Sequence, residues 1–289
     1  MQEQDSTNSL LIRTFGDVYV IRGSDPKPLP IPPRVQNLLI YLAVQGRPLT
    51  REQLYDLFWP DLPSHKAQRN LRKLLFDCQQ RLFPYFTVER EWVGLEPAYS
   101  YRLDAAIFQQ RGQPLLQAYE QQKPLPPKEL QQIQEVLNLY QGAFLASGKL
   151  PRSMRYEQWV QQQQERHYNL AYQLFDIVRL QLLHSQRHQE TIRLMRAWLY
   201  VDPYNEEVHG ALLLLLSRHG QHAEAIKHYE SYHHFVTSTL GDEPTAHLQA
   251  MYAQLRVGWL PEEKPAAVAH PPYTPEEPPP PAAASQSLQ

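Results

Sequence analysis

Two stretches of the chain repeat one another at a fixed distance, and this limits how its second half can fold. Residues 186–192 (QRHQETI) and 220–226 (GQHAEAI) lie 34 residues apart. The segments before them align at the same distance, with Leu182 falling on Leu216. A repeat of this length is one structural unit that cannot bury its apolar face alone, so neighbouring units must stack. The second half is therefore expected to be a stack of helices.

A period of 34 residues is that of the tetratricopeptide repeat, in which each unit is a pair of helices. Helical patterning begins at Asp104 and continues over residues 129–139 and 152–185, the second being one long helix or two in line. A further helix over residues 245–256 closes the stack. The sequence thus predicts an all-α domain of two repeats and a closing helix.

The first hundred residues alternate between β-prone runs and amphipathic helices. A helix over residues 34–44 ends before Gly46, and Thr50 with Gln53 fits a capping box for a second helix. Ser64 can cap a third helix that runs to Leu82. The element order is β-β-α-α-α-β-β-β, with strands over residues 10–15, 18–21, 86–89, 92–95 and 99–103.

The third helix has two different faces. Helical geometry places its apolar residues on one stripe and centres the opposite face on Arg69, Lys73, Phe76 and Gln80, with Lys66 and Arg72 beside it. Arg and Lys side chains there can pair with phosphates or with guanine edges. An ordinary amphipathic helix with a solvated basic face is the alternative. The apolar stripe is Ala67, Leu71, Leu74, Leu75, Cys78 and Leu82.

The order of the elements favours the nucleic-acid interpretation. Two helices, a turn, a basic third helix and a β-hairpin form a winged helix-turn-helix, in which the third helix enters the major groove and the hairpin reaches the flanking backbone. Arg90 would be the wing contact and Arg51 a phosphate contact. Asn70 and Phe76 are candidate base contacts, although Phe76 could instead pack on a neighbouring domain.

Other reactive side chains have simpler explanations. The one cysteine, Cys78, lies on the apolar stripe and is expected to be an inert core residue, and it excludes an internal disulfide. Residues 142–150 lack the spacing of a phosphate-binding loop, and no catalytic motif is present, so neither an enzyme nor a cofactor is expected. The late histidines are interpreted as solvated helix faces rather than metal ligands: His184, His188, His209, His219, His222, His228, His233 and His234.

Composition indicates the cellular location of the protein and the disorder of its two termini. No stretch approaches the ~20 apolar residues of a membrane helix, and the polar start is unlike a signal peptide, which predicts a cytoplasmic protein with no membrane partner. Residues 1–9 are expected to be disordered. Residues 259–289 are expected to be disordered as well, because the last thirty residues contain nine Pro and six Ala.

An ordered set of segments over residues 10–257 resembles one family, the SARP-like bacterial transcriptional regulators. These join an OmpR-type winged helix to a tetratricopeptide-like bacterial transcriptional activator domain. The segments similar to the family's first domain are residues 38–43, 46–54, 57–61, 69–72 and 101–104. Those similar to its second domain are residues 140–145, 157–159, 165–166, 202–203, 206–209 and 240–244.

The resemblance implies an α+β winged helix over residues 10–103 and a helical activator domain over residues 104–258. It implies a sequence-specific activator that reads double-stranded DNA with the helix over residues 64–82. The helical domain would contact RNA polymerase or form a homodimer on repeated sites. Asp77 departs from the family's Arg-rich pattern and would repel phosphates. The alternative is therefore a protein-interaction scaffold whose winged helix no longer binds DNA.

Overall fold

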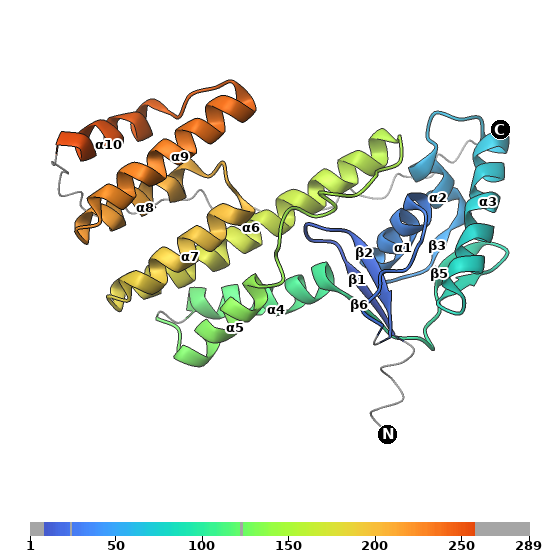
Figure 1. Ribbon diagram of the computed structural model, residues 1–289. Coiled ribbons are helices and arrows are strands. Elements are labelled where there is room, and N and C mark those ends of the chain that lie inside the picture. Colours follow the sequence, from blue (N-terminus) through green and yellow to red (C-terminus); the bar gives the residue numbers. More distant parts are fainter. Residues whose placement is uncertain (1–8, 24, 122–123, 258–289) are drawn as a thin grey trace, which may run out of the picture.

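The computed structural model describes residues 9–23, 25–121 and 124–257. Figure 1 shows a blue-to-cyan part that contains sheets and helices, and a green-to-red helical part beside it. The termini predicted to be disordered, residues 1–9 and 259–289, lie outside the described residues except for Ser9. The predicted fold class, a winged helix followed by an all-α tetratricopeptide-like domain, is confirmed.

The winged part contains two small sheets. In the first, β1 (Leu10–Arg13) pairs antiparallel with β2 (Tyr19–Arg22) and parallel with β6 (Tyr101–Leu103). In the second, β5 (Trp92–Leu95) lies between β3 (Leu49–Thr50) and β4 (Phe86–Val88). The two-residue strand β3 was not predicted, because so short a run carries no alternation.

Three helices complete this part and match their predicted positions. They are α1 (Pro33–Gln45), α2 (Arg51–Phe58) and α3 (Ser64–Leu82). Gly46 ends α1 with φ 63°, a left-handed conformation that glycine adopts at little cost. The capping box of Thr50 and Gln53 is present. The predicted cap at Ser64 is wrong. Pro63 precedes the helix, Ser64 is its first residue, and no side chain in the described part of the chain caps it.

The helical part begins without a loop, because α4 (Asp104–Gln121) follows β6 directly. Residues 152–185 were predicted to form one long helix or two helices in line, and the structure has one continuous helix there. The remaining helices are α5 (Pro127–Leu137), α6 (Met154–His184), α7 (His188–Val201), α8 (Glu206–Arg218), α9 (His222–Leu240) and α10 (Ala246–Val257). The 34-residue repeat therefore aligns the second half of α6 with α8, and α7 with α9.

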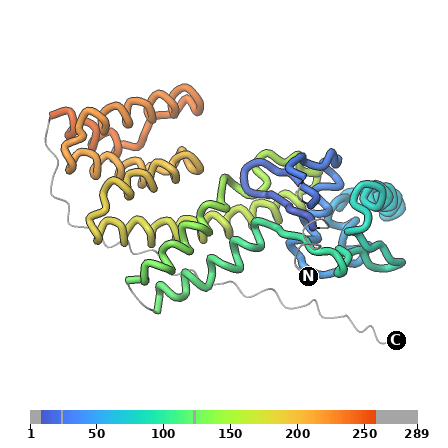
Figure 2. Tube along the Cα trace, turned by 60° about the horizontal axis from the view of Figure 1, so that its bottom comes forward, coloured from blue at the N-terminus to red at the C-terminus, as the bar shows by residue number. Residues whose placement is uncertain are grey.

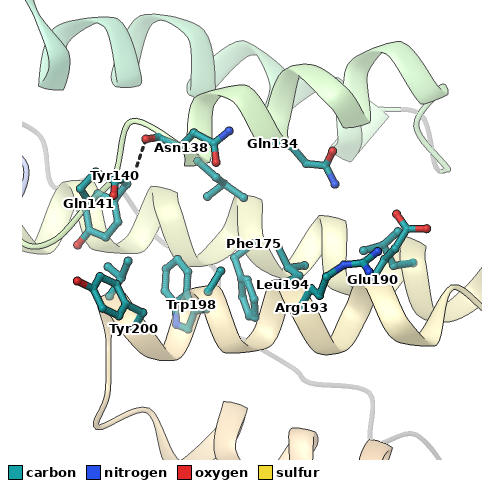
Figure 3. A pocket seen from close by; sticks show the side chains of 14 residues that line it. Gln134, Asn138, Tyr140, Gln141, Phe175, Glu190, Arg193, Leu194, Trp198 and Tyr200 are labelled. Atoms are coloured by element: carbon teal, nitrogen blue, oxygen red, sulfur yellow. Dashed lines mark hydrogen bonds between the residues drawn. The ribbon is translucent and has the colours of Figure 1, made fainter.

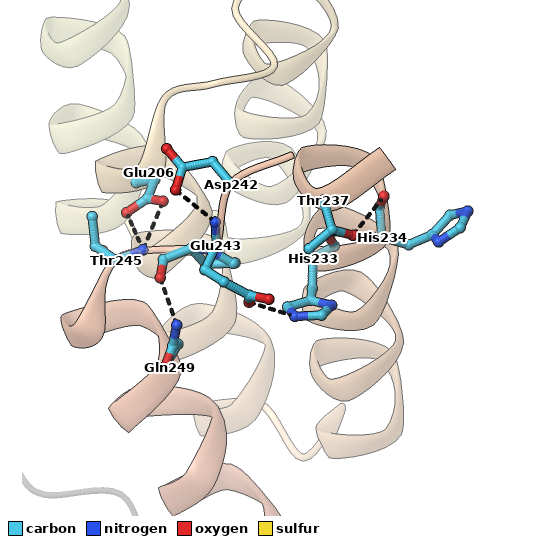
Figure 4. Close-up of polar contacts among 9 residues, drawn as sticks. Glu206, His233, His234, Thr237, Asp242, Glu243, Thr245 and Gln249 are labelled. Atoms are coloured by element: carbon cyan, nitrogen blue, oxygen red, sulfur yellow. Dashed lines mark hydrogen bonds and ion pairs between the residues drawn. The ribbon is translucent and has the colours of Figure 1, made fainter. Parts of the chain in front are cut away.

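Polar contacts fix the end of the stack. The carboxylate of Glu206, in the first turn of α8, accepts hydrogen bonds from the main-chain N–H of Thr245 just before α10 (Figure 4). Nε2 of His233 in α9 lies 2.8 Å from Oε2 of Glu243. Leu248, Met251 and Leu255 supply the buried face of α10. The closing helix thus covers the last repeat, as predicted.

The two parts share one continuous apolar core. Phe15 forms an isolated antiparallel β-bridge with Phe144 of the helical part. The ring of Phe15 also contacts the rings of Phe108 and His167 edge-on. At the start of α6, the hydroxyl of Ser153 donates a hydrogen bond to the main-chain oxygen of Leu57 in α2. In Figure 1 the first half of α6 lies against the winged part and its second half lies among the stacked helices. The long helix therefore contacts both α2 and the stacked helices.

Candidate nucleic-acid interface

The apolar stripe of α3 is buried as predicted. Each of its six members is less than a tenth exposed, so the helix has one fixed face toward α1, α2 and β4. Burial raises the pKa of the Cys78 thiol to about 12, and Asp77 beside it acts in the same direction. The expectation that Cys78 is a buried core residue is confirmed. Because the stripe fixes the rotation of α3, it also determines which side chains face outward.

The outward face of α3 is strongly basic. Lys66, Arg69, Arg72 and Lys73 are all exposed, and within the described residues none of their side chains has an ion pair or hydrogen bond to the protein. Asn70 is half-buried between them. The helix lies at the outer edge of the molecule in Figures 1 and 2. These cations are consequently free to meet an external anion.

Two aromatic side chains extend this face toward the end of α3. Phe76 is 60% exposed and Phe83, seven residues later and thus on the same side, is 73% exposed. The sequence singled out Phe76 but missed Phe83, whose spacing from Phe76 was the available signal. The half-buried Asp77 follows Phe76 in the chain and is the one acidic residue of α3.

The wing is the hairpin of β4 and β5, and Arg90 is exposed at its turn. Arg51, the first residue of α2, lies beside this turn. Its guanidinium donates to the main-chain oxygen of Glu89 at 2.9 and 3.3 Å, and its main-chain N–H donates to Glu91 at 3.1 Å. Two of the guanidinium nitrogens of Arg51 therefore hold the wing turn against α2, a role that the sequence did not indicate.

The wing surface is of mixed character. Arg90 lies between two exposed acids, Glu89 and Glu91. Trp92, the first residue of β5, is 44% exposed, while its neighbour Val93 is buried. Trp92 was not predicted as part of the interface. The available signal was an aromatic residue just after a hairpin turn, next to an apolar valine in an alternating strand. The cations of the interface are thus concentrated on α3 rather than on the wing.

The interpretation of the late histidines as solvated is wrong for His209. It is 6% exposed, because α9 covers it: its ring lies 3.8 Å from that of Tyr232, and its Nδ1 lies 2.9 Å from Nε2 of His228. Its Nε2 lies 3.0 Å from the main-chain oxygen of Pro203, which can only accept, so this nitrogen carries the proton. His228 must then donate to Nδ1 of His209.

This arrangement keeps both rings neutral. Burial lowers the pKa of His228 to about 4, with further lowering by His209 and Arg196 and opposition from Glu224. Burial also lowers the pKa of His209, against the opposing effects of the Pro203 carbonyl, Glu206 and Asp202. Within the described residues, no group of three or more His, Cys, Asp or Glu side chains could hold a metal ion.

A comparison with protein-family models decides the classification. The model described as "Bacterial transcriptional activator domain" matches residues 103–256. The chain belongs to this family. The bacterial transcriptional activator domain begins at the last residue of β6 and ends at Arg256 within α10, so it covers the helical part except for its last residue. Together with the winged helix before it, the domain makes the chain a SARP-like transcriptional regulator, as the resemblance implied.

A solved structure has a similar fold. It is described as "Mycobacterium tuberculosis EmbR in complex with low affinity phosphopeptide". The match has a TM-score of 0.51 and 16% sequence identity, and it covers 86% of this activator-domain protein and 65% of that chain. This protein therefore spans about two thirds of the length of that structure. A search of curated proteins finds no match.

Within residues 9–23, 25–121 and 124–257, no helix of this activator-domain protein is both long and apolar enough to span a bilayer.

Proposed function

We propose that this protein is a sequence-specific, DNA-binding transcriptional activator that places α3 in the major groove. The observation that carries the proposal is the exposed basic face of α3, whose four cations have no protein partner within the described residues. Uncompensated cations on one face of an outlying helix match the charge of a phosphate backbone. The family match to transcriptional regulators supports the same function.

The side chains would have different roles. Lys66, Arg69, Arg72 and Lys73 would contact phosphates or guanine edges, because these long cations point away from the core. The amide of Asn70 could pair with an adenine edge, and Phe76 could contact a thymine methyl group. This set gives both positioning contacts and base contacts on one helix.

The wing would contact the DNA backbone beside the groove. Arg90 is exposed at the turn and would meet a phosphate. Arg51 would hold the wing through Glu89 and direct its remaining Nη1 group to a neighbouring phosphate. The helical domain would contact RNA polymerase or a second copy of the chain on repeated sites, because a helical stack offers an extended protein-binding surface.

The test is selection of genomic fragments by the purified protein, with Arg69→Ala plus Lys73→Ala in parallel. The double variant should keep its fold, because both side chains lie opposite the buried stripe, and should lose the enriched motif. Arg111→Ala plus Lys128→Ala is the matched control, since both residues are exposed on the helical domain. Unchanged enrichment in the Arg69/Lys73 variant would exclude this face as the DNA contact.

A second function, a protein-interaction scaffold, is favoured by other observations on the same surface. Asp77 and the two acids of the wing turn oppose phosphate binding, and Phe76 with Phe83 offers apolar area. Salt dependence separates the two functions. Groove binding gives a log–log slope of about 0.9 per phosphate contact, so four or more contacts lower the affinity steeply. A flat salt dependence with retained partner binding would favour the scaffold.

A further inference from the structure

A groove of about 630 Å³ lies between α5 and α7, with α6 beneath it (Figure 3). Phe175 and Leu182 of α6 are part of its floor. Gln134 and Asn138 line the α5 side, and Arg193 lies on α7 opposite them. The volume is within the ~300–1,000 Å³ typical of ligand sites. The groove is separate from the basic face of α3, so the proposed DNA contact does not use it.

One end of the groove is aromatic. The ring planes of Tyr140 and Trp198 are nearly parallel, at 15°, with centroids 6.3 Å apart, and Phe175 stacks on Trp198 at 4.7 Å. Tyr200 is 85% exposed at the rim. Within the described residues, the indole Nε1 of Trp198 has no hydrogen-bond acceptor although the side chain is buried. A carbonyl oxygen of a bound peptide could accept this bond after a small rotation of the ring.

The other end of the groove is positively charged. Glu190 is neutralised by Arg187, whose Nε donates to its carboxylate at 2.7 Å. Arg193 is exposed, and in the described part of the chain it has no ion pair or hydrogen bond. The groove thus combines aromatic surface, side-chain amides and one uncompensated cation. A rigid, proline-rich peptide with acidic residues has the matching chemistry.

We propose that the groove binds residues 271–281 of this same chain, PPYTPEEPPPP. Seven of these eleven residues are proline, so the segment loses little conformational entropy on binding an aromatic groove as an extended peptide. Glu276 and Glu277 would lie opposite Arg193, and a peptide carbonyl would meet Trp198. The occupant is therefore a segment whose charge and stiffness both fit.

The chain length permits this contact. About 14 residues separate Val257, where α10 ends, from Pro271, which is up to ~45 Å of extended chain. In Figures 1 and 2 the red end of α10 lies in the half of the molecule that contains α5 and α7, away from the winged part. A tethered segment has an effective concentration on the order of millimolar, so even a ~100 μM intrinsic affinity leaves the groove mostly occupied.

The experiment measures anisotropy of a labelled 271–281 peptide added to the full chain and to a chain ending at residue 258. Within the described residues the last buried core side chain is Leu255, so the shortened chain keeps that core. We expect the peptide to bind the shortened chain at least tenfold more tightly, because the full chain's own segment competes for the groove. Equal affinity for the two chains, or binding to neither, would overturn the proposal.

Charge reversal locates the peptide. Arg193→Glu in the shortened chain should weaken binding about tenfold, and a Glu276→Lys, Glu277→Lys peptide should recover most of that loss. Arg155→Glu is the matched control, because Arg155 is exposed on α6 outside the groove and should leave the affinity unchanged. Tyr200→Ala, at an exposed position, should weaken binding independently. Equal effects of Arg193→Glu and Arg155→Glu would place the peptide elsewhere and overturn the assignment.

Discussion

The carboxylate of Asp104 accepts hydrogen bonds from the main-chain N–H and the hydroxyl of Thr14, with the N–H at 2.8 Å from Oδ2. The main-chain N–H of Phe15 donates to the same carboxylate at 3.2 Å. Both Thr14 and Asp104 are buried. Asp104 is the first residue of α4, so a single side chain ties the start of the helical part to the loop after β1.

Asp104→Ala should therefore lower the free energy of unfolding by about 3 kcal/mol, because buried N–H and O–H donors are left without an acceptor. Asp104→Asn keeps one acceptor oxygen and should cost roughly half as much. Urea unfolding followed by circular dichroism measures both variants. Asp56→Ala, exposed on α2, is the control and should stay within ~0.5 kcal/mol of the parent. A loss below ~1 kcal/mol for Asp104→Ala would show that the contact is not structural.

Arg51→Ala should loosen the wing, since it removes the two hydrogen bonds to the main-chain oxygen of Glu89. Hydrogen exchange at the amide of Glu89, which donates to Trp92 across the hairpin, reports this directly. We expect severalfold faster exchange there. Arg90→Ala is the comparison, because Arg90 makes no such bond to any residue that the structure describes, and this variant should leave exchange unchanged. Equal exchange in the two variants would contradict the anchoring role of Arg51.

Acid should destabilise the helical stack through the His209–His228 pair. Unfolded histidine titrates near 6.5, whereas the folded pKa of His228 is about 4, so the unfolded chain binds more protons between these values. The stability from this group is complete above pH ~7 and is lost as the pH falls toward 4. From pH 7.5 to pH 5 the loss should be about 2 kcal/mol for His228.

His228→Gln should flatten the pH dependence of the unfolding free energy, whatever its effect at pH 7.5. It should not abolish the dependence, because burial lowers the pKa of His167 to about 4 as well. His234→Gln, exposed on α9, is the matched control. If the unfolding free energy of His228→Gln depended on pH as steeply as that of the parent, the His209–His228 pair would not be a cause of the acid sensitivity.

Cys78 should resist thiol reagents in the folded protein. Its side chain is fully buried and its pKa is raised to about 12, so the reactive thiolate is both scarce and inaccessible. At pH 8, modification should be at least a hundredfold slower than in urea, and the single cysteine makes the signal unambiguous. Rapid stoichiometric modification without denaturant would mean that α3 separates readily from its neighbours.

The parts of the fold that depend on local patterns were predictable. The buried stripe of α3 follows from its 3.6-residue periodicity, and the cap at Thr50 follows from residue types three apart. The basic face opposite the stripe followed from the same geometry. The order of the 34-residue repeats was equally visible, because repetition is a property of the sequence itself.

The parts that depend on distant partners were not predictable. The parallel pairing of β6 with β1 joins residues about ninety positions apart, and no local pattern encodes it. His209 looked like an ordinary polar residue, and its burial depends on how α9 lies against α8. The anchoring role of Arg51 could be recognised only from the position of the wing relative to α2. The sequence predicted the wing as a hairpin but not where it lies.

If the protein binds repeated DNA sites as proposed, the junction through Ser153, Asp104 and the shared core has a consequence for the spacing of those sites. If two copies bind neighbouring repeats in contact, neither can swivel its helical domain to find the other. Inserting about five base pairs between the repeats turns one copy to the opposite side of the duplex, and about ten restore its direction. Cooperative occupancy should then rise and fall with the helical phase of the DNA rather than decline smoothly with distance.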